Sequence, residues 1–418
     1  MKKILLVAGA ALLLVVAGLV AFALYRKHQG RDVRGSSSVE FVTTQAPKPK
    51  PKPVNQFVWP MYRFDPAREG APQGIPPTIR PPFRPQWFFG ARSLVEFPPT
   101  AAHGHLFVAN ANGTIFALDT ARRGVTWRLR TRRCTAATPA VAGGAVFMSF
   151  LNRPPCNATR SGLTGEVLAL DEDTGKIRWR VAMGPTESSP LVVGRLVYVG
   201  DWRGKVYALS TATGRTVWSY QTGDKVKDGI AYAGGRVYFG SYDHHVYALN
   251  ARTGRLVWKA SAQQRLGPRG TFYSTPAVAY DRVYIGGTDR KVYSFGATSG
   301  KLRWSQSTSG YVYASPAVWR ERVLVGSYDG TFYCLDAATG DVRWTFKANG
   351  PISGSAVVIN GVVYFSTFNN RTYALDALTG KPLWFFRRGK YAGVVSDGRQ
   401  LFLVGYARVY AMKLKGRR

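Results

Sequence analysis

The stretch from Ala208 to Trp218, Ala-Leu-Ser-Thr-Ala-Thr-Gly-Arg-Thr-Val-Trp, decides the fold because the chain repeats it. From Ala248 to Trp258 the sequence reads Ala-Leu-Asn-Ala-Arg-Thr-Gly-Arg-Leu-Val-Trp. Five further units end in the same way, with a glycine shortly before a tryptophan. The tryptophans are separated by 52, 39, 40, 46, 40 and 40 residues, and they are Trp127, Trp179, Trp218, Trp258, Trp304, Trp344 and Trp384.

Each repeat contains four short segments that alternate apolar and polar residues, which is the pattern of β-strands. In the unit that ends near Trp218 these segments are 190–193, 195–199, 205–209 and 215–220. Turn-forming residues such as Arg203-Gly204 separate the second strand from the third. A period of about 40 residues with four strands is typical of one propeller blade. The repeat therefore predicts an all-β propeller over residues 87–415.

The number of blades follows from the two ends of the repeat region. Seven units end in a tryptophan strand, and after Trp384 the chain offers three more strands near residues 393–395, 400–404 and 407–412. The missing fourth strand is available at the start, in Pro85-Gln-Trp87-Phe-Phe. Pairing the two ends makes an eighth blade and leaves no large unpaired sheet edge. We predict an eight-bladed propeller in which Trp87 lies against the strand around Tyr410.

The N-terminal region reads as an anchor, a spacer and a lead-in. Residues 4–24 carry no charge and are long enough to span a bilayer as a helix within a 1–29 anchor, although Ala21-Phe22-Ala23 also resembles a signal cleavage site. Residues 30–56 contain a Pro-Lys alternation at 47–53 that favours an extended linker, or a stripe that binds anionic headgroups. Residues 57–86 are Pro-rich and irregular. We expect a single-pass anchor in the cell membrane with the propeller on the extracytoplasmic side.

The composition bounds the chemistry of the chain. Aromatic residues at 13% and hydrophobic residues at 45% provide a substantial core. The 57 Lys and Arg against 23 Asp and Glu give a formal net charge of +34. The basic residues are spread through every repeat and no nucleic-acid-binding motif occurs, so anionic envelope components are the expected neighbours rather than nucleic acid.

The repeat resembles a known family. Its Ala-Leu-Asp-x-x-Thr-Gly-x-x-x-Trp signature is similar to the tryptophan-docking repeat of pyrroloquinoline-quinone-like (PQQ-like) propellers over residues 87–415, and the lead-in from Trp59 to Gly70 looks like theirs. That family contains quinoprotein alcohol and sugar dehydrogenases and the non-enzymatic outer-membrane protein assembly factor B, to which the repeat type and blade number are most similar. The resemblance implies that the seven repeat tryptophans wedge between blades.

Cysteine usage bears on the enzymatic alternative. Quinoprotein dehydrogenases of this fold typically stack the quinone on a disulfide of adjacent cysteines and hold calcium with carboxylate and amide oxygens. The three cysteines, Cys134, Cys156 and Cys334, include no adjacent pair. Cys156 lies in the 12-residue excess of the longest repeat, so either a disulfide with Cys134 closes that insertion or both are free thiols. We predict no cofactor and no metal site, with PQQ and calcium belonging only to the dehydrogenase alternative.

The candidate site comes from aligning the repeats on their innermost strands. One position just before each innermost strand is expected to project around one mouth of the central channel. There a Glu187–Lys227 pair is expected to face an aromatic arc of Tyr273, Tyr313 and Tyr391, and nearby Arg and Lys residues would make this face cationic. The alternative is a solvated pore rim. The eight positions are Glu96, Ala136, Glu187, Lys227, Tyr273, Tyr313, Ser353 and Tyr391.

These observations favour a membrane-tethered, monomeric and non-catalytic propeller that acts as a binding scaffold. Its expected partner is another envelope protein, a peptide or a polyanion. The alternative function is a PQQ-dependent alcohol or sugar dehydrogenase.

Overall fold

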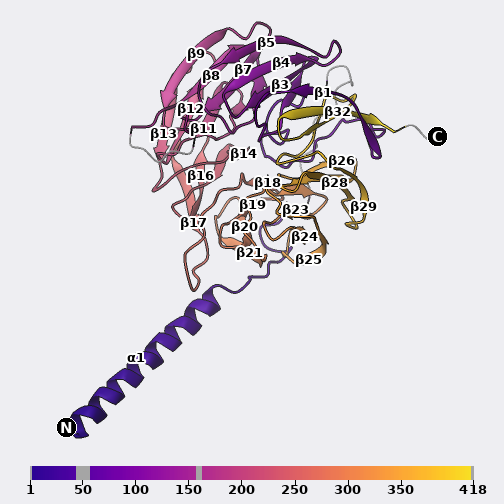
Figure 1. Ribbon diagram of the computed structural model, residues 1–418. Coiled ribbons are helices and arrows are strands. Elements are labelled where there is room, and N and C mark those ends of the chain that lie inside the picture. The colour runs from indigo at the N-terminus through magenta and orange to yellow at the C-terminus, as the bar shows by residue number, and fades with distance from the viewer. Residues whose placement is uncertain (1, 44–56, 157–161, 416–418) are drawn as a thin grey trace.

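The computed structural model describes residues 2–43, 57–156 and 162–415, and within these residues the strands form eight four-stranded sheets arranged in a ring (Figure 1). This arrangement confirms the predicted eight-bladed propeller. The first blades are built from β2 Thr100–Ala102, β3 His105–Asn110, β4 Thr114–Asp119 and β5 Gly124–Arg130 (blade 1); β6 Ala140–Ala142, β7 Ala145–Phe150, β8 Gly165–Asp171 and β9 Ile177–Met183 (blade 2); β10 Leu191–Val193, β11 Leu196–Gly200, β12 Lys205–Ser210 and β13 Thr216–Gln221 (blade 3); and β14 Ala231–Ala233, β15 Arg236–Gly240, β16 His245–Asn250 and β17 Leu256–Ser261 (blade 4).

The remaining blades continue the same order from the axis outward. They are built from β18 Ala277–Ala279, β19 Arg282–Gly286, β20 Lys291–Gly296 and β21 Leu302–Ser307 (blade 5); β22 Ala317–Trp319, β23 Arg322–Gly326, β24 Thr331–Asp336 and β25 Val342–Lys347 (blade 6); β26 Val357–Ile359, β27 Val362–Thr367, β28 Arg371–Asp376 and β29 Pro382–Phe386 (blade 7); and β30 Val395–Ser396, β31 Leu401–Val404, β32 Arg408–Leu414 and β1 Phe83–Gly90 (blade 8).

The repeat tryptophans connect neighbouring blades. Trp218 on β13 is buried, its indole Nε1 donates a hydrogen bond to the Ala251 carbonyl of blade 4 at 2.8 Å, and its ring lies under Gly254. A Cβ at Gly254 would lie 2.6 Å from the Trp218 ring, so only glycine fits there. The same glycine-over-indole packing recurs from blade 1 to blade 6. Its pairs are Trp127–Gly175, Trp179–Gly214, Trp218–Gly254, Trp258–Gly300, Trp304–Gly340 and Trp344–Gly380.

The eighth blade joins the two ends of the propeller. Strand β1 pairs antiparallel with β32, with Trp87 opposite Ala411 and Phe88 opposite Tyr410. The predicted pairing of Trp87 with the segment around Tyr410 is therefore confirmed. Between blades 7 and 8, Trp384 packs edge-on against the ring of Phe83, because blade 8 has no Thr-Gly turn to receive the indole.

The lead-in that precedes β1 closes one end of the channel. Carbonyl oxygens between Trp59 and Gly70 accept hydrogen bonds from the middle residues of six innermost strands, β2, β6, β14, β18, β22 and β26. Two buried arginines reinforce this contact. Arg63 donates to the carbonyls of Ser315 and Ala356, and Arg68 donates to that of Ile230 at 3.0 Å. The sequence indicated only that this segment is irregular, whereas the structure makes it the base of the channel.

The N-terminal helix α1, Lys2–Gln29, extends away from the rim of the ring, and Ala11–Gln29 is long and apolar enough to cross a membrane (Figure 1). The residues that follow, 30–43, form a strap against blade 5. Asp32 accepts from Lys291 Nζ at 2.5 Å, and the buried Arg282 donates to the Val39 carbonyl at 2.6 Å. This part of the expected 30–56 linker is thus bound to the propeller, while the Pro-Lys alternation at 47–53 lies outside the described residues.

Candidate binding pocket at the channel mouth

A cavity of about 330 Å³ lies in the channel directly on the lead-in, whose residues Trp59, Tyr62 and Arg63 form part of its lining. Six of the eight predicted rim positions line it: Glu96, Lys227, Tyr273, Tyr313, Ser353 and Tyr391. Glu187 contacts Lys227 beside the cavity, and Ala136 is not part of the lining. These residues converge because the start of every innermost strand lies near the propeller axis.

Lys227 is held between an acid and three aromatic rings. Its Nζ lies 3.0 Å from Glu187 Oε1, and Trp202 Nε1 donates to the same oxygen at 3.0 Å. The ammonium also lies 4.7 Å from the ring centroid of Trp202, 5.3 Å from that of Tyr273 and 5.5 Å from that of Tyr242. Aromatic faces at these distances attract a cation. The expected Glu187–Lys227 pair is therefore close in space, inside an aromatic cage.

The aromatic arc contains more rings than the three that the alignment of the repeats predicts. Six rings meet in series, with centroids 4.8–6.4 Å apart, in the order Tyr242, Tyr273, Tyr313, Tyr328, Phe368 and Tyr391. Tyr273, Tyr313 and Tyr391 come from the predicted rim position. Tyr242, Tyr328 and Phe368 come from the turn after the second strand of their blades, as does Trp202. An aromatic residue recurs at this turn in the repeats, and that recurrence is the signal that could have identified the second set.

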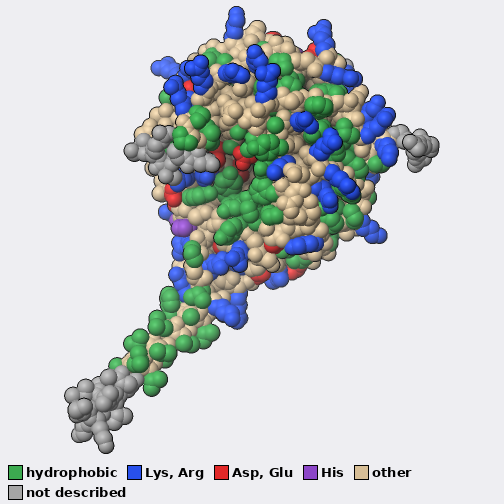
Figure 2. All heavy atoms as spheres, viewed as in Figure 1, with side chains coloured by type: hydrophobic (Ala, Val, Ile, Leu, Met, Phe, Trp, Pro, Cys, Tyr) green, Lys and Arg blue, Asp and Glu red, His purple; other side chains and the backbone are tan. Residues whose placement is uncertain are grey.

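The pocket holds acidic and basic side chains together, with Glu96 and Asp228 beside Arg63 and Lys227 in its lining. Burial raises the pKa of Glu187 to about 7, against the opposing effects of Lys227 and Trp202. Burial also raises the pKa of Glu96 and of Asp228, although two backbone N–H groups, of Gly229 and Thr275, donate to Asp228. Acidic and apolar side chains lie near the centre of the ring, surrounded by Lys and Arg (Figure 2). Lys and Arg side chains thus surround a pocket whose own lining carries charges of both signs.

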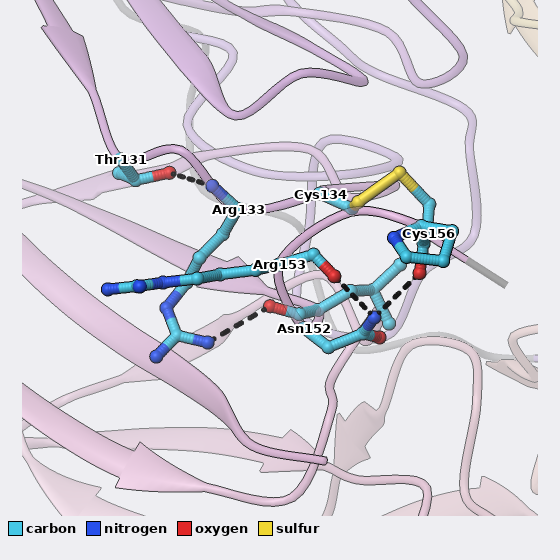
Figure 3. Close-up of a disulfide and its surroundings, with 8 residues drawn as sticks. Thr131, Arg133, Cys134, Asn152, Arg153 and Cys156 are labelled. Carbon is cyan, nitrogen blue, oxygen red and sulfur yellow. Dashed lines mark hydrogen bonds between the residues drawn. A yellow bond between two sulfur atoms is a disulfide. The ribbon is translucent and has the colours of Figure 1, made fainter. Parts of the chain in front are cut away.

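The two cysteines for which a disulfide was one of two alternatives lie where the loop after β5 meets the insertion of blade 2. Cys134 and Cys156 are joined by a disulfide with their Cα atoms 5.5 Å apart (Figure 3). The third cysteine, Cys334, is a buried free thiol in β24. Beside the disulfide, the Asn152 side-chain amide donates to the carbonyls of Arg153 and Pro155. The disulfide ties the start of the insertion in blade 2 to the loop that follows β5.

The pocket residues fit a calcium-bound quinone poorly. The cysteines are not adjacent, and the disulfide joins two loops instead of forming a stacking platform. Glu187 is engaged by Lys227 and Trp202, and both oxygens of Asp228 accept backbone N–H groups. These donors already use part of the acceptor capacity that calcium would need from the two carboxylates. In the described residues, no three His, Cys, Asp or Glu side chains are grouped as a metal site would require.

Comparison with known proteins places the fold in context. Two solved structures share the architecture: BamB from Moraxella catarrhalis, with a TM-score of 0.65 and 18% identity over 81% of this chain and 99% of that one, and a europium-containing methanol dehydrogenase, with a TM-score of 0.73 and 14% identity over 86% and 98%. These likenesses show the fold alone. A ring of four-stranded blades locked by repeat tryptophans defines the class of PQQ-like repeat propellers.

The sequence matches narrow the class to a family. The family described as outer membrane protein assembly factor BamB matches residues 163–311, 263–353 and 350–417, so this chain belongs to it. BamB of Nitrosomonas eutropha is 26% identical over 144 residues, 34% of this chain and 32% of the relative. BamB of Escherichia coli is 27% identical over 135 residues, 30% of this chain and 31% of the relative. The matches thus span about a third of the length of these curated relatives, and the family resemblance expected from the repeat is confirmed.

Proposed function

We propose that this chain is a membrane-anchored, extracytoplasmic and non-catalytic scaffold that binds a partner protein at the channel mouth. The observation that carries the proposal is the pocket: a cavity closed at its base by the lead-in and walled by a continuous arc of six aromatic rings. Concave sites with aromatic walls and a few convergent polar groups are the usual location of bound ligands. The relatives named as assembly factors support a protein as the partner.

Two further features support the proposed location. The apolar helix α1 continues directly into the strap on blade 5, so a bilayer crossed by α1 would hold the propeller at its surface. The disulfide between Cys134 and Cys156 belongs to an oxidising compartment, which in a bacterial-type envelope lies outside the cytoplasm.

The test is affinity capture of the full chain from detergent-solubilised membranes. We expect one envelope protein to co-purify with the wild type and to be lost from a Glu187→Ala/Tyr313→Ala double variant, because that variant removes the ion-pair partner of Lys227 and an inner ring of the aromatic arc. The control is Glu321→Ala/Tyr406→Ala, which changes an acid and a tyrosine outside the cavity lining. Equal capture by both variants would place the partner elsewhere on the molecule.

A dehydrogenase makes a different prediction for the same protein. The structural likeness to a methanol dehydrogenase motivates its test. Incubation with PQQ and calcium, followed by alcohols and sugars in the presence of a redox dye, is expected to give neither a bound-quinone spectrum nor dye reduction. Dye reduction that depends on the quinone and on a substrate would replace the scaffold with an oxidoreductase.

A further inference from the structure

The outer strand of blade 5 binds part of the chain's own strap. Val33 forms an antiparallel bridge with Ser305 on β21, whose N–H donates to the Val33 carbonyl at 2.9 Å. The neighbouring Asp32 accepts from Ser307 Oγ at 2.6 Å and from Lys291 Nζ at 2.5 Å. The groove beside this strand therefore accommodates an extended segment with an acidic side chain.

Blade 1 has the equivalent groove. Arg128 and Arg130 on β5 follow Trp127 by one and three residues, as Ser305 and Ser307 follow Trp304 on β21. Arg130 pairs with Thr114 in the register in which Ser307 pairs with Lys291. A cavity of about 400 Å³ lies at this position of blade 1. Its lining includes Arg92, Asn110, Asn112, Thr114, Arg128, Arg130 and Arg132.

Four exposed arginines thus line one open groove, and within the described residues none of them has an ion pair or a side-chain hydrogen bond. The position of Arg92 is fixed by its neighbour, because Ala91 N donates to the Ala407 carbonyl and the buried Asn110 amide donates to the Ala91 carbonyl at 2.7 Å. By contrast, the adjacent Arg133 pairs with Glu166 at 3.1 Å. Like charges in one cavity repel each other, and carboxylates are the natural complement of the planar guanidinium.

A second groove of about 480 Å³, lined mostly by apolar side chains, overlaps the first. It shares Arg92, Phe116 and Arg128 with the first cavity and extends past Phe89 and Val125, of which Val125 is 46% exposed. The two cavities run along the outer strand between blade 8 and blade 1. An extended chain that lay along β5 would place alternate side chains on this apolar surface.

We propose that this groove binds an extended acidic segment of a partner protein, which lies along the outer edge of β5 as the strap lies along β21. Its carboxylates pair with Arg92, Arg128, Arg130 and Arg132, and its apolar side chains contact Phe89 and Val125. Arg128 occupies the position on β5 that Ser305 occupies on β21, so the backbone N–H of Arg128 would donate to the bound segment as that of Ser305 donates to Val33. The site is separate from the channel mouth and does not depend on the proposed pocket.

Fluorescence anisotropy of a labelled 12-residue peptide of alternating Glu and Val tests this proposal on the full chain in detergent. We expect Arg128→Gln/Arg130→Gln/Arg132→Gln to weaken binding at least tenfold. The matched control, Arg195→Gln/Arg215→Gln/Arg255→Gln, removes the same charge from three exposed arginines on blades 3 and 4 and is expected to change affinity less than twofold. Circular dichroism and melting curves establish that both variants fold.

The other possible results either overturn or support the proposed groove. Equal weakening by the two triple variants would reduce the effect to net charge and overturn the site, as would a peptide that does not bind the wild type. Inorganic tripolyphosphate serves as a second probe. If it binds this groove and the peptide does not, the groove takes a phosphate polymer and the proposal fails. Peptide-dependent protection of the amides of residues 124–132 from hydrogen exchange is the supporting result.

Discussion

At the scale of single residues, burial brings the ionisation of the Glu187 carboxyl close to neutral pH. Burial raises the pKa of its carboxyl from the usual 4.5 to about 7, while Lys227 and Trp202 act in the opposite direction. Between these two values the folded state binds more protons at Glu187 than the unfolded state does. Its contribution to stability is therefore present below about pH 4.5 and lost as the pH rises toward 7.

We predict that Glu187→Gln flattens this pH dependence. Glutamine still offers Trp202 an acceptor and cannot ionise. From pH 5 to pH 8, the free energy of unfolding of the wild type should fall relative to that of the variant by about 2 kcal/mol. Urea unfolding followed by tryptophan fluorescence at each pH measures the difference. Parallel pH profiles would show that the carboxyl ionises normally in the folded state.

Arg68 illustrates a second residue-scale effect, since it is fully buried in the base of the channel. Burial lowers the pKa of its guanidinium to about 10, so the group stays charged at neutral pH. It donates to the carbonyls of Ile230 and Tyr62. Because Arg68→Met leaves these carbonyls without a donor, we predict a loss of about 3 kcal/mol of unfolding free energy. The control Arg122→Met changes an exposed arginine and should be close to neutral in the same urea titration.

At the scale of elements, the unit of construction is the turn that receives the tryptophan of the preceding blade. Gly254 has φ +71° and sits on the Trp218 ring. Gly235 has φ +74°, with no atom within 4 Å of a Cβ built on it. Both glycines therefore adopt the left-handed backbone conformation, but only Gly254 packs against another residue at the Cβ position.

We predict that Gly235→Ala costs about 1–2 kcal/mol for the left-handed backbone alone. Gly254→Ala should cost at least about 2 kcal/mol more, because the methyl group overlaps the indole and forces blades 3 and 4 apart. Melting temperatures and urea midpoints of the two variants give the comparison. Equal losses would mean that the indole moves aside without cost.

The repeat also explains how much of the site was accessible from sequence. The register of the innermost strand placed Glu96, Lys227 and Tyr313 around one cavity, because each repeat puts equivalent positions at the same distance from the axis. The closed base of the channel was not predictable in this way. Residues 57–70 occur once and have no periodicity, and their backbone hydrogen bonds reach strands from 42 residues away (Trp59 to Ala101) to 288 residues away (Gly70 to Val358). The strap was missed for the same reason, because Asp32 and Lys291 are far apart in the chain.

At the scale of the whole molecule, stability depends on the pairing of β1 with β32. Truncation after Val404 removes β32 and exposes the edges of β1 and β31. We predict that this variant loses its cooperative unfolding transition and aggregates, because the ring cannot close. Truncation after Lys415 keeps the full strand and should unfold like the wild type. Size-exclusion chromatography and thermal melting distinguish the two, and a monomeric, cooperatively melting short form would mean that seven blades suffice.

The attachment point of α1 has a geometric consequence. The strap attaches α1 to β21, which is the outermost strand of its blade. The anchor therefore extends from the outer edge of the propeller and not from its top or bottom face. With α1 perpendicular to the bilayer, the axis of the propeller would lie parallel to the membrane plane. The opening of the pocket, which Tyr313 and Tyr328 line, would then face parallel to the membrane plane. A partner protein embedded in the same membrane could reach this opening without leaving the bilayer.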